Sequence, residues 1–125
     1  MIIIEKYYEV IVRTLELLKT IEDGFIHIQN QVSELNYEEA FIIMQDAMEG
    51  MAGIDNAIQP IIDRVGENDT DALYRDLKEN INKAVNEFEK GQDVKLEDLI
   101  EQEVTPAFLK WKKEIERILK PYILS

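Results

Sequence analysis

A regular spacing of apolar residues over the first third of the chain limits what this sequence can fold into. Apolar side chains recur at every third or fourth position, namely at 4, 8, 11, 15, 18, 21, 25, 28, 32 and 35. Their average spacing is about 3.5 residues, the period of a helix that packs lengthwise against other helices. We therefore predict a first helix of about thirty residues, roughly 45 Å long, that needs apolar partners along its whole length.

Gly24 is the weak point of this helix, because a glycine in a helix interior costs about 1 kcal/mol relative to alanine. The apolar spacing keeps its phase across Gly24, so we favour a continuous or gently bent helix. A break at Gly24, which would give five helices, is the alternative.

Three further helices follow from patterns of the same kind. Asn36 precedes two glutamates, which is typical of a capped helix start, so a second helix should begin after a very short turn and run antiparallel to the first. Small residues at 47, 50, 53 and 57 of this helix leave space for another backbone. Residues 66–70 form a turn by composition, a third helix ends at Gly91, and a fourth begins near Asp93.

Prolines interrupt two of these helices. Pro60 in the second helix and Pro106 in the fourth lack an amide hydrogen, and each ring crowds the carbonyl group four residues earlier, so we expect a kink at both. Pro121 ends the fourth helix. Because no strand-like alternation is visible, we predict an all-α fold: an antiparallel up-down four-helix bundle with a long first helix and proline-kinked second and fourth helices.

Length and composition narrow the class of protein. The chain has 125 residues, enough for one domain with a single core, which we place at residues 1–125. It contains no cysteine, so packing alone holds the fold, and a reducing cytoplasm is the natural location. No stretch reaches the length of about eighteen uncharged residues that a membrane span requires. Twenty-six acidic residues against fourteen basic ones give a net charge of −12, which repels nucleic acid.

The chain lacks the residue sets of two classes of helical enzyme. Di-iron bundles need two Glu-x-x-His pairs, whereas His27 is the only histidine. Helical pyrophosphohydrolases hold magnesium with two acidic clusters, and the nearest match, Glu97-Asp98-x-x-Glu101, has no second cluster. We therefore expect no catalytic residue, no metal and no cofactor, and we do not expect an enzyme.

A second apolar stripe lies beside the first on the first helix, so that the N-terminal half of this helix is apolar over a wide face. The stripe either is buried, with residues 122–124 covering it, or binds a protein partner or a second copy of the chain. On the second helix three methionines share one face, and flexible thioethers suit a binding surface as well as a core. The predicted partner-binding residues are Ile3, Tyr7, Val10, Leu17, Met44, Met48 and Met51.

A kink at Pro106 would open a small pocket with carboxylates at its edge. Glu101 and Glu103 precede the proline, and Trp111, the only tryptophan, lies about one turn beyond it. The simpler interpretation is that Trp111 fills the core and the two glutamates face water.

Two segments resemble uncharacterised small, acidic, all-helical proteins of Gram-positive bacteria. They are Asp98-Leu99-Ile100-Glu101-x-Glu103-Val104-x-Pro106-x-x-x-x-Trp111 and Asn36-Tyr37-Glu38-Glu39-Ala40. The resemblance implies a helical fold and no particular activity. In size, charge and class the chain is also similar to flagellar and type III export chaperones, which hold an amphipathic segment of a secreted client, and this similarity implies a chaperone-like function.

Taken together, these patterns predict a cytoplasmic protein-protein interaction module, chaperone-like or dimeric, that binds a helix in a groove or associates with its own copy. The alternative is an enzyme or sensor for a small ligand or metal, with its pocket near Pro106. Neither nucleic acid nor a membrane is expected as a partner.

Overall fold

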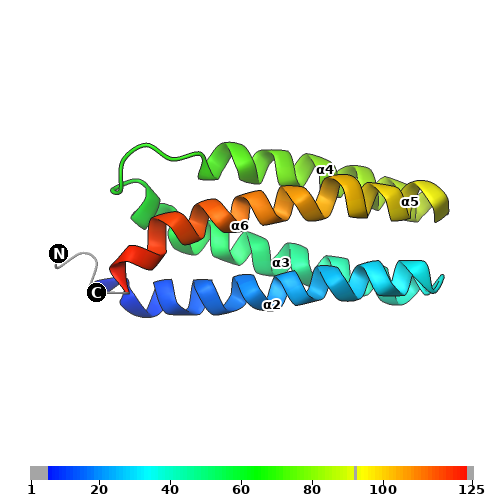
Figure 1. Cartoon of the computed structure of the whole chain (residues 1–125), viewed down its shortest axis with the longest axis horizontal. Coiled ribbons are helices and arrows are strands. Elements are labelled where there is room, and N and C mark those ends of the chain that lie inside the picture. The colour runs from blue at the N-terminus through cyan, green and yellow to red at the C-terminus, as the bar shows by residue number, and fades with distance from the viewer. Residues whose placement is uncertain (1–5, 92, 124–125) are drawn as a thin grey trace.

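The computed structural model describes residues 6–91 and 93–123, which fold into four helical arms (Figure 1). No strand occurs within these ranges, so the predicted all-α class is confirmed. We refer to α5, η1 and α6 together as the fourth arm. The elements are α2 (Tyr8–Ser33), α3 (Tyr37–Ile62), α4 (Thr70–Lys90), α5 (Asp93–Leu99), the π-helix η1 (Ile100–Val104), α6 (Thr105–Leu119) and the 3-10 helix η2 (Lys120–Tyr122).

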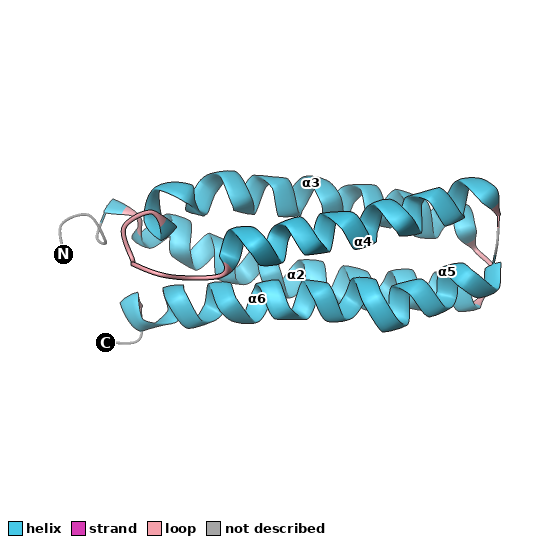
Figure 2. Cartoon of the chain, turned by 90° about the horizontal axis from the view of Figure 1, so that it is seen from above, coloured by secondary structure: helices cyan, strands magenta, loops and turns pink. Residues whose placement is uncertain are grey.

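Successive arms run in opposite directions. In Figure 1, α2 leads away from the end of the bundle where both termini lie, α3 returns, α4 leads away again, and the fourth arm comes back. Figure 2 shows the bundle from above, with the connections confined to its two ends. The closest pairings along the bundle are α2 with α3 and α4 with the fourth arm.

The long first helix is present and unbroken. α2 passes through Gly24 without interruption, so its predicted continuity is confirmed. The side chains that it buries follow the expected spacing of three and four, which places them on one face. They are Ile11, Thr14, Leu18, Ile21, Phe25, Ile28 and Val32.

Aromatic side chains link three of the arms at the centre of the core. The ring centroid of Phe25 on α2 lies 4.9 Å from that of Phe108 on α6, and Trp111 stacks on Tyr74 of α4 at 5.1 Å. Phe25, Phe108 and Trp111 are at most 1% exposed. Burial of one such side chain contributes about 1.5–3 kcal/mol before the entropy of ordering it is subtracted.

Left-handed residues end two of the helices. Gly91 ends α4 as predicted, with φ at 67°, a conformation that carries no steric penalty for glycine. Leu35 follows α2 with φ at 65°, where a β-carbon is strained. The predicted side-chain cap at Asn36 is wrong. Its Nδ2 donates to Oε1 of Gln31 at 2.9 Å instead, because the chain turns back toward the last turn of α2 before α3 begins.

The two internal prolines are accommodated in different ways. Just before Pro106 the backbone N–H of Thr105 donates to the carbonyl of Ile100, five residues earlier, and the wider π-helical turn relieves the crowding that a proline ring causes. Pro60 lies within the last turn of α3, which does not re-initiate there and ends at Ile62. A kink at either proline stays a prediction.

Glu114 of α6 ties the loop between α3 and α4 to the fourth arm. Its Oε2 accepts a hydrogen bond from the backbone N–H of Asp69 at 2.9 Å, and Arg117 donates to both carboxylate oxygens at 2.7 and 2.9 Å. The side chain is 12% exposed. The hydrogen bonds from Arg117, and then that from Asp69, hold the pKa of Glu114 below its ordinary value against the opposing effect of burial.

We expect Glu114→Gln to lower the free energy of unfolding by about 1–2 kcal/mol at neutral pH, because charge-assisted hydrogen bonds are lost. The pKa of Glu114 is lower in the folded state, so the unfolded state binds more protons in acid. The stabilisation is therefore present at neutral pH and is lost as the pH falls from about 5 to about 3. Urea unfolding of both proteins across this range measures the effect, and a difference that stays constant with pH would contradict it.

Leu35→Gly should raise the free energy of unfolding by about 0.5–1 kcal/mol, because glycine adopts the left-handed conformation without strain. Leu35→Ala is the matched control, since alanine keeps the strain while it removes the same exposed side chain. Thermal unfolding of the two variants distinguishes them, and equal melting temperatures would show that the left-handed turn stores no strain.

Candidate functional site

A shallow apolar groove lies between the first half of α2 and the second half of α3, two helices that run side by side in Figure 1. Its volume is about 180 Å³, and it contains one charged residue, Arg13. Val10 and Leu17, two of the predicted partner-binding residues, both line it. The complete lining is Val10, Arg13, Thr14, Leu17, Gly53, Ile54 and Ala57.

Small residues on α3 create this groove. A β-carbon at Gly53 would meet no atom within 4 Å, so the groove is open above this residue. One turn earlier the two helices are closer, since a β-carbon at Gly50 would lie 3.0 Å from Cδ1 of Ile21. The helix pair is therefore tightly packed near Gly50 and leaves an open apolar strip beside Gly53 and Ala57.

Acidic residues border the groove on both helices. On α2, Glu9 and Glu16 lie four residues before and three residues after Arg13 and are exposed. On α3, Asp46 and Glu49 lie seven and four residues before Gly53 and are also exposed. These spacings place them near the same side of each helix as the groove residues, together with the exposed Lys6, which lies seven residues before Arg13. Four acids against Lys6 and Arg13 leave the surroundings of the apolar strip negatively charged.

The other predicted partner-binding residues do not form a shared surface. Met44 and Met51 are fully buried in the core, and Met48 and Tyr7 are half-buried against it. The methionines fill the core because their positions on α3 follow the buried seam. Ile3 lies outside the described residues. Tyr122 and Ile123, in the C-terminal segment, are partly buried and pack against the core, whereas Leu124 lies outside the described residues. That this segment covers the second apolar stripe stays a prediction.

The structure does not bring Glu101, Glu103 and Trp111 together in one pocket. Trp111 is 0% exposed and stacks on Tyr74 inside the bundle. Glu101 faces a depression toward α2, whereas Glu103 lines a separate cleft toward α4. Glu101 and Glu103 are only two residues apart on η1, so their side chains point in different directions around the fourth arm.

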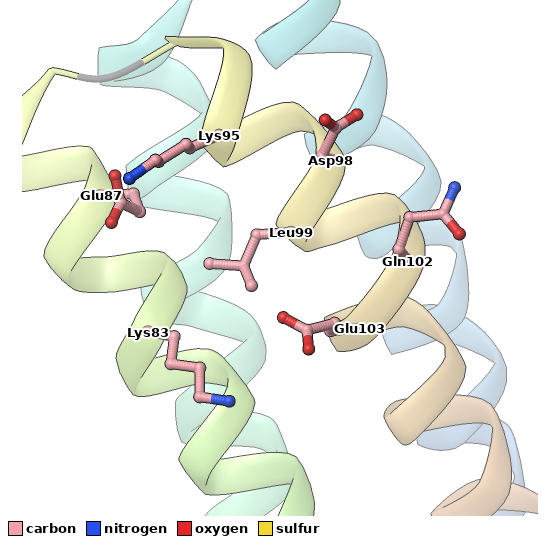
Figure 3. A pocket seen from close by; sticks show the side chains of 7 residues that line it. All are labelled: Lys83, Glu87, Lys95, Asp98, Leu99, Gln102 and Glu103. Carbon is pink, nitrogen blue, oxygen red and sulfur yellow. The ribbon is translucent and has the colours of Figure 1, made fainter.

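The cleft beside Glu103 is the larger opening, with a volume of about 600 Å³ between α4 and the fourth arm (Figure 3). Lys83 and Glu87 come from α4, and Lys95, Leu99 and Glu103 extend toward them from α5 and η1. Figure 3 shows the remaining two lining side chains pointing away from α4; they are Asp98 and Gln102. Nothing in the amino-acid pattern distinguishes Lys83, Glu87 and Lys95, because lysine and glutamate are the ordinary residues of an exposed helix face.

Two titratable groups with raised pKa values lie between α3 and α4. Burial raises the pKa of Asp55, with the charge of Asp71 adding to the effect and a hydrogen bond from Gln59 opposing it. Burial, followed by the charge of Asp55, also raises the pKa of Tyr74. Neither side chain lines the groove or the cleft, so these shifts reflect helix packing.

His27, the single histidine, is exposed, and its Nε2 lies 3.5 Å from Nε2 of Gln31. Within residues 6–91 and 93–123, no three histidine, aspartate or glutamate side chains are grouped so that they could hold a metal ion. In the same part of the chain, no helix has the length and apolarity needed to cross a bilayer.

Fold and surface together define an all-α four-helix protein that carries an apolar groove on one helix pair and a charged cleft on the other. The model of a family described as a domain of unknown function, DUF8042, matches residues 9–114, and the chain belongs to that family. No curated protein and no solved structure matches the sequence.

Replacing the glycine at the base of the groove should stabilise the fold. We expect Gly53→Ala to raise the free energy of unfolding by about 0.5–1 kcal/mol, because alanine is the better helix former and its β-carbon meets nothing. Gly50→Ala is the matched control and should gain less, since its β-carbon presses on Ile21. Denaturant unfolding measures both, and a larger gain at Gly50 would contradict the described packing.

Proposed function

We propose that the protein is a protein-protein interaction module, and that the groove between α2 and α3 holds the apolar face of an amphipathic helix with basic flanks. The observation that carries this proposal is the apolar strip around Leu17 and Gly53, which is open to solvent although it lies beside the core. Exposed apolar surface bordered by polar residues is typical of interaction sites.

The shape of the groove suits a helix. Val10 and Leu17 lie seven residues apart, two turns along α2, and the opposite wall is lowered by Gly53 and Ala57. A partner helix presents ridges of side chains at three- and four-residue spacing, and ridges of this kind pack into such a groove when small residues let the backbones approach. The strip is short, so we expect a reversible complex.

Electrostatics select the partner. The chain carries a net charge of −12, and the exposed residues beside the groove include Glu9, Glu16, Asp46 and Glu49. A helix with lysine or arginine on both sides of its apolar stripe would be attracted to this surface, whereas an acidic helix would be repelled. We place the protein in the cytoplasm and assign it a chaperone-like role toward a basic amphipathic segment, with no catalytic activity of its own.

Leu17→Glu tests the proposal, because it puts a charge into the groove at a residue that is already 37% exposed. We expect the affinity for a helical peptide with leucine on one face and lysine on the other to fall by about tenfold or more, since the burial of a leucine is lost. Leu109→Glu is the matched control: Leu109 is 39% exposed, lies on α6 away from the groove, and should leave the affinity unchanged. Fluorescence anisotropy of the labelled peptide gives both values.

Equal peptide binding by Leu17→Glu and Leu109→Glu would contradict the groove as the site. Three controls accompany this comparison. Circular dichroism must show equal helicity for both variants, and a peptide with glutamate in place of lysine must bind more weakly than the lysine peptide. Sedimentation of the wild type alone gives the oligomeric state: a dimer that Leu17→Glu disrupts would assign the groove to a second copy and overturn the basic partner.

A further inference from the structure

We propose that the cleft between α4 and the fourth arm is a second, independent binding site, and that it takes a small zwitterion with an apolar side chain, the chemistry of a free α-amino acid such as leucine. The site shares no residue with the groove between α2 and α3. A result that contradicts one of the two proposed sites therefore leaves the other proposal intact.

The size and composition of the cleft fit such a molecule. Its volume of about 600 Å³ lies within the range of small-molecule sites, about 300–1,000 Å³. Leu99 lies at its centre in Figure 3, half-buried and in contact with the core, so it offers an apolar surface between the charged groups. An aliphatic side chain of a ligand would cover Leu99 and remove it from water.

Charges of both signs face this space from opposite helices. Lys83 and Glu87 are one turn apart on α4, and Lys95 and Glu103 lie two turns apart on the fourth arm. None of the ion pairs between described residues joins α4 to α5 or η1, and Lys83, Lys95 and Glu103 have no hydrogen-bond or ion-pair partner in that part of the chain. Ammonium groups and carboxylates therefore converge on the cleft without neutralising one another.

Glu87 supplies the strongest pointer to a ligand. Its side chain is only 15% exposed; Oε1 lies 3.9 Å from Nζ of Lys90, while Oε2 is buried and has no partner among the described groups. A buried carboxylate oxygen without a hydrogen bond is costly, and such groups are otherwise paired. The ammonium group of a bound amino acid would pair with the Glu87 carboxylate, which lines the cleft, and the carboxylate of the ligand would then be held by the ammonium group of Lys83 or Lys95.

The backbone next to the cleft is also unusual. Glu103 lies on the π-helix η1, and Leu99 is the residue directly before η1 begins. Leu99 and Glu103 lie four residues apart and both extend toward α4 in Figure 3. Single π-helical turns inside α-helices occur frequently at functional sites.

Three probes of the same apolar shape test the charge requirement. Leucine carries both charges, 4-methylpentanoate lacks the ammonium group, and 3-methylbutylamine lacks the carboxylate. In amide NMR titrations we expect leucine to shift the signals of residues that line the cleft, and each singly charged probe to bind at least about tenfold more weakly. Equal binding of the amine would reduce the site to a cation contact, and no shift at millimolar leucine would show that there is no site; either outcome overturns the proposal.

Glu87→Met separates a ligand site from an ordinary ion pair. Methionine matches the length of the side chain and removes the unpaired oxygen, so we expect leucine binding to be lost while the melting temperature rises by about 3 °C or more. Glu79→Met, at an exposed position of α4 outside the cleft, is the control and should change neither value. A lower melting temperature for Glu87→Met would show that Glu87 pairs with a lysine for stability, which contradicts the proposal.

Lys83→Met provides a variant that does not depend on a buried position, because Lys83 is exposed. It should weaken leucine binding and leave the binding of 3-methylbutylamine unchanged, since only the carboxylate of the ligand loses its partner. An equal loss for both probes would show that the substitution acts on the cleft in general and would overturn the assigned orientation.

Discussion

Burial of one continuous apolar core holds this protein together, because the chain has no cysteine and the described residues group no metal ligands. The contacts among Phe25, Phe108, Trp111 and Tyr74 join α2, α4 and α6 at the centre of this core. Since interiors of this kind are close-packed and tolerate little change in volume, the helix positions are fixed together rather than one by one. The geometry of the surface sites depends on that arrangement. The groove lies where small residues end the close packing of α2 on α3, and the cleft lies between α4 and the fourth arm.

The helical arms could be predicted from the sequence because their apolar spacing is set by the core itself. Periodicity identified α2 as one long helix, and Gly91 marked the end of α4 because a left-handed residue is needed there. Local hydrogen bonding was harder to predict. Asn36 has the right residue type and position for a cap, yet its side-chain oxygen accepts no hydrogen bond from the first turn of α3, and its Nδ2 donates to Gln31 and Glu34.

The candidate sites were only partly predictable, for a related reason. Val10 and Leu17 could be identified because an apolar stripe wider than one packing face has to meet something. Trp111 could be placed near Pro106 along the chain but not around the helix axis, because the π-helical turn at residues 100–104 alters the phase between Glu103 and the residues beyond it. Met44 and Met51 show a further limit: thioethers serve cores and surfaces equally, so side-chain chemistry alone does not separate the two.

The distribution of charge and burial argues that the two surfaces differ in what they contribute to the fold. The groove exists because Gly53 leaves space that a larger residue would fill, and the negative residues beside it are exposed to solvent. The cleft is different, because Glu87 keeps a carboxylate oxygen buried without a partner, at a cost to the folded state that a neutral side chain of the same length would avoid. Other described side chains are also buried without a partner, namely Thr70, Thr105 and Trp111, but of these groups only Glu87 lines the cleft. The groove therefore follows from how small residues pack, while the cleft requires an explanation that packing alone does not give.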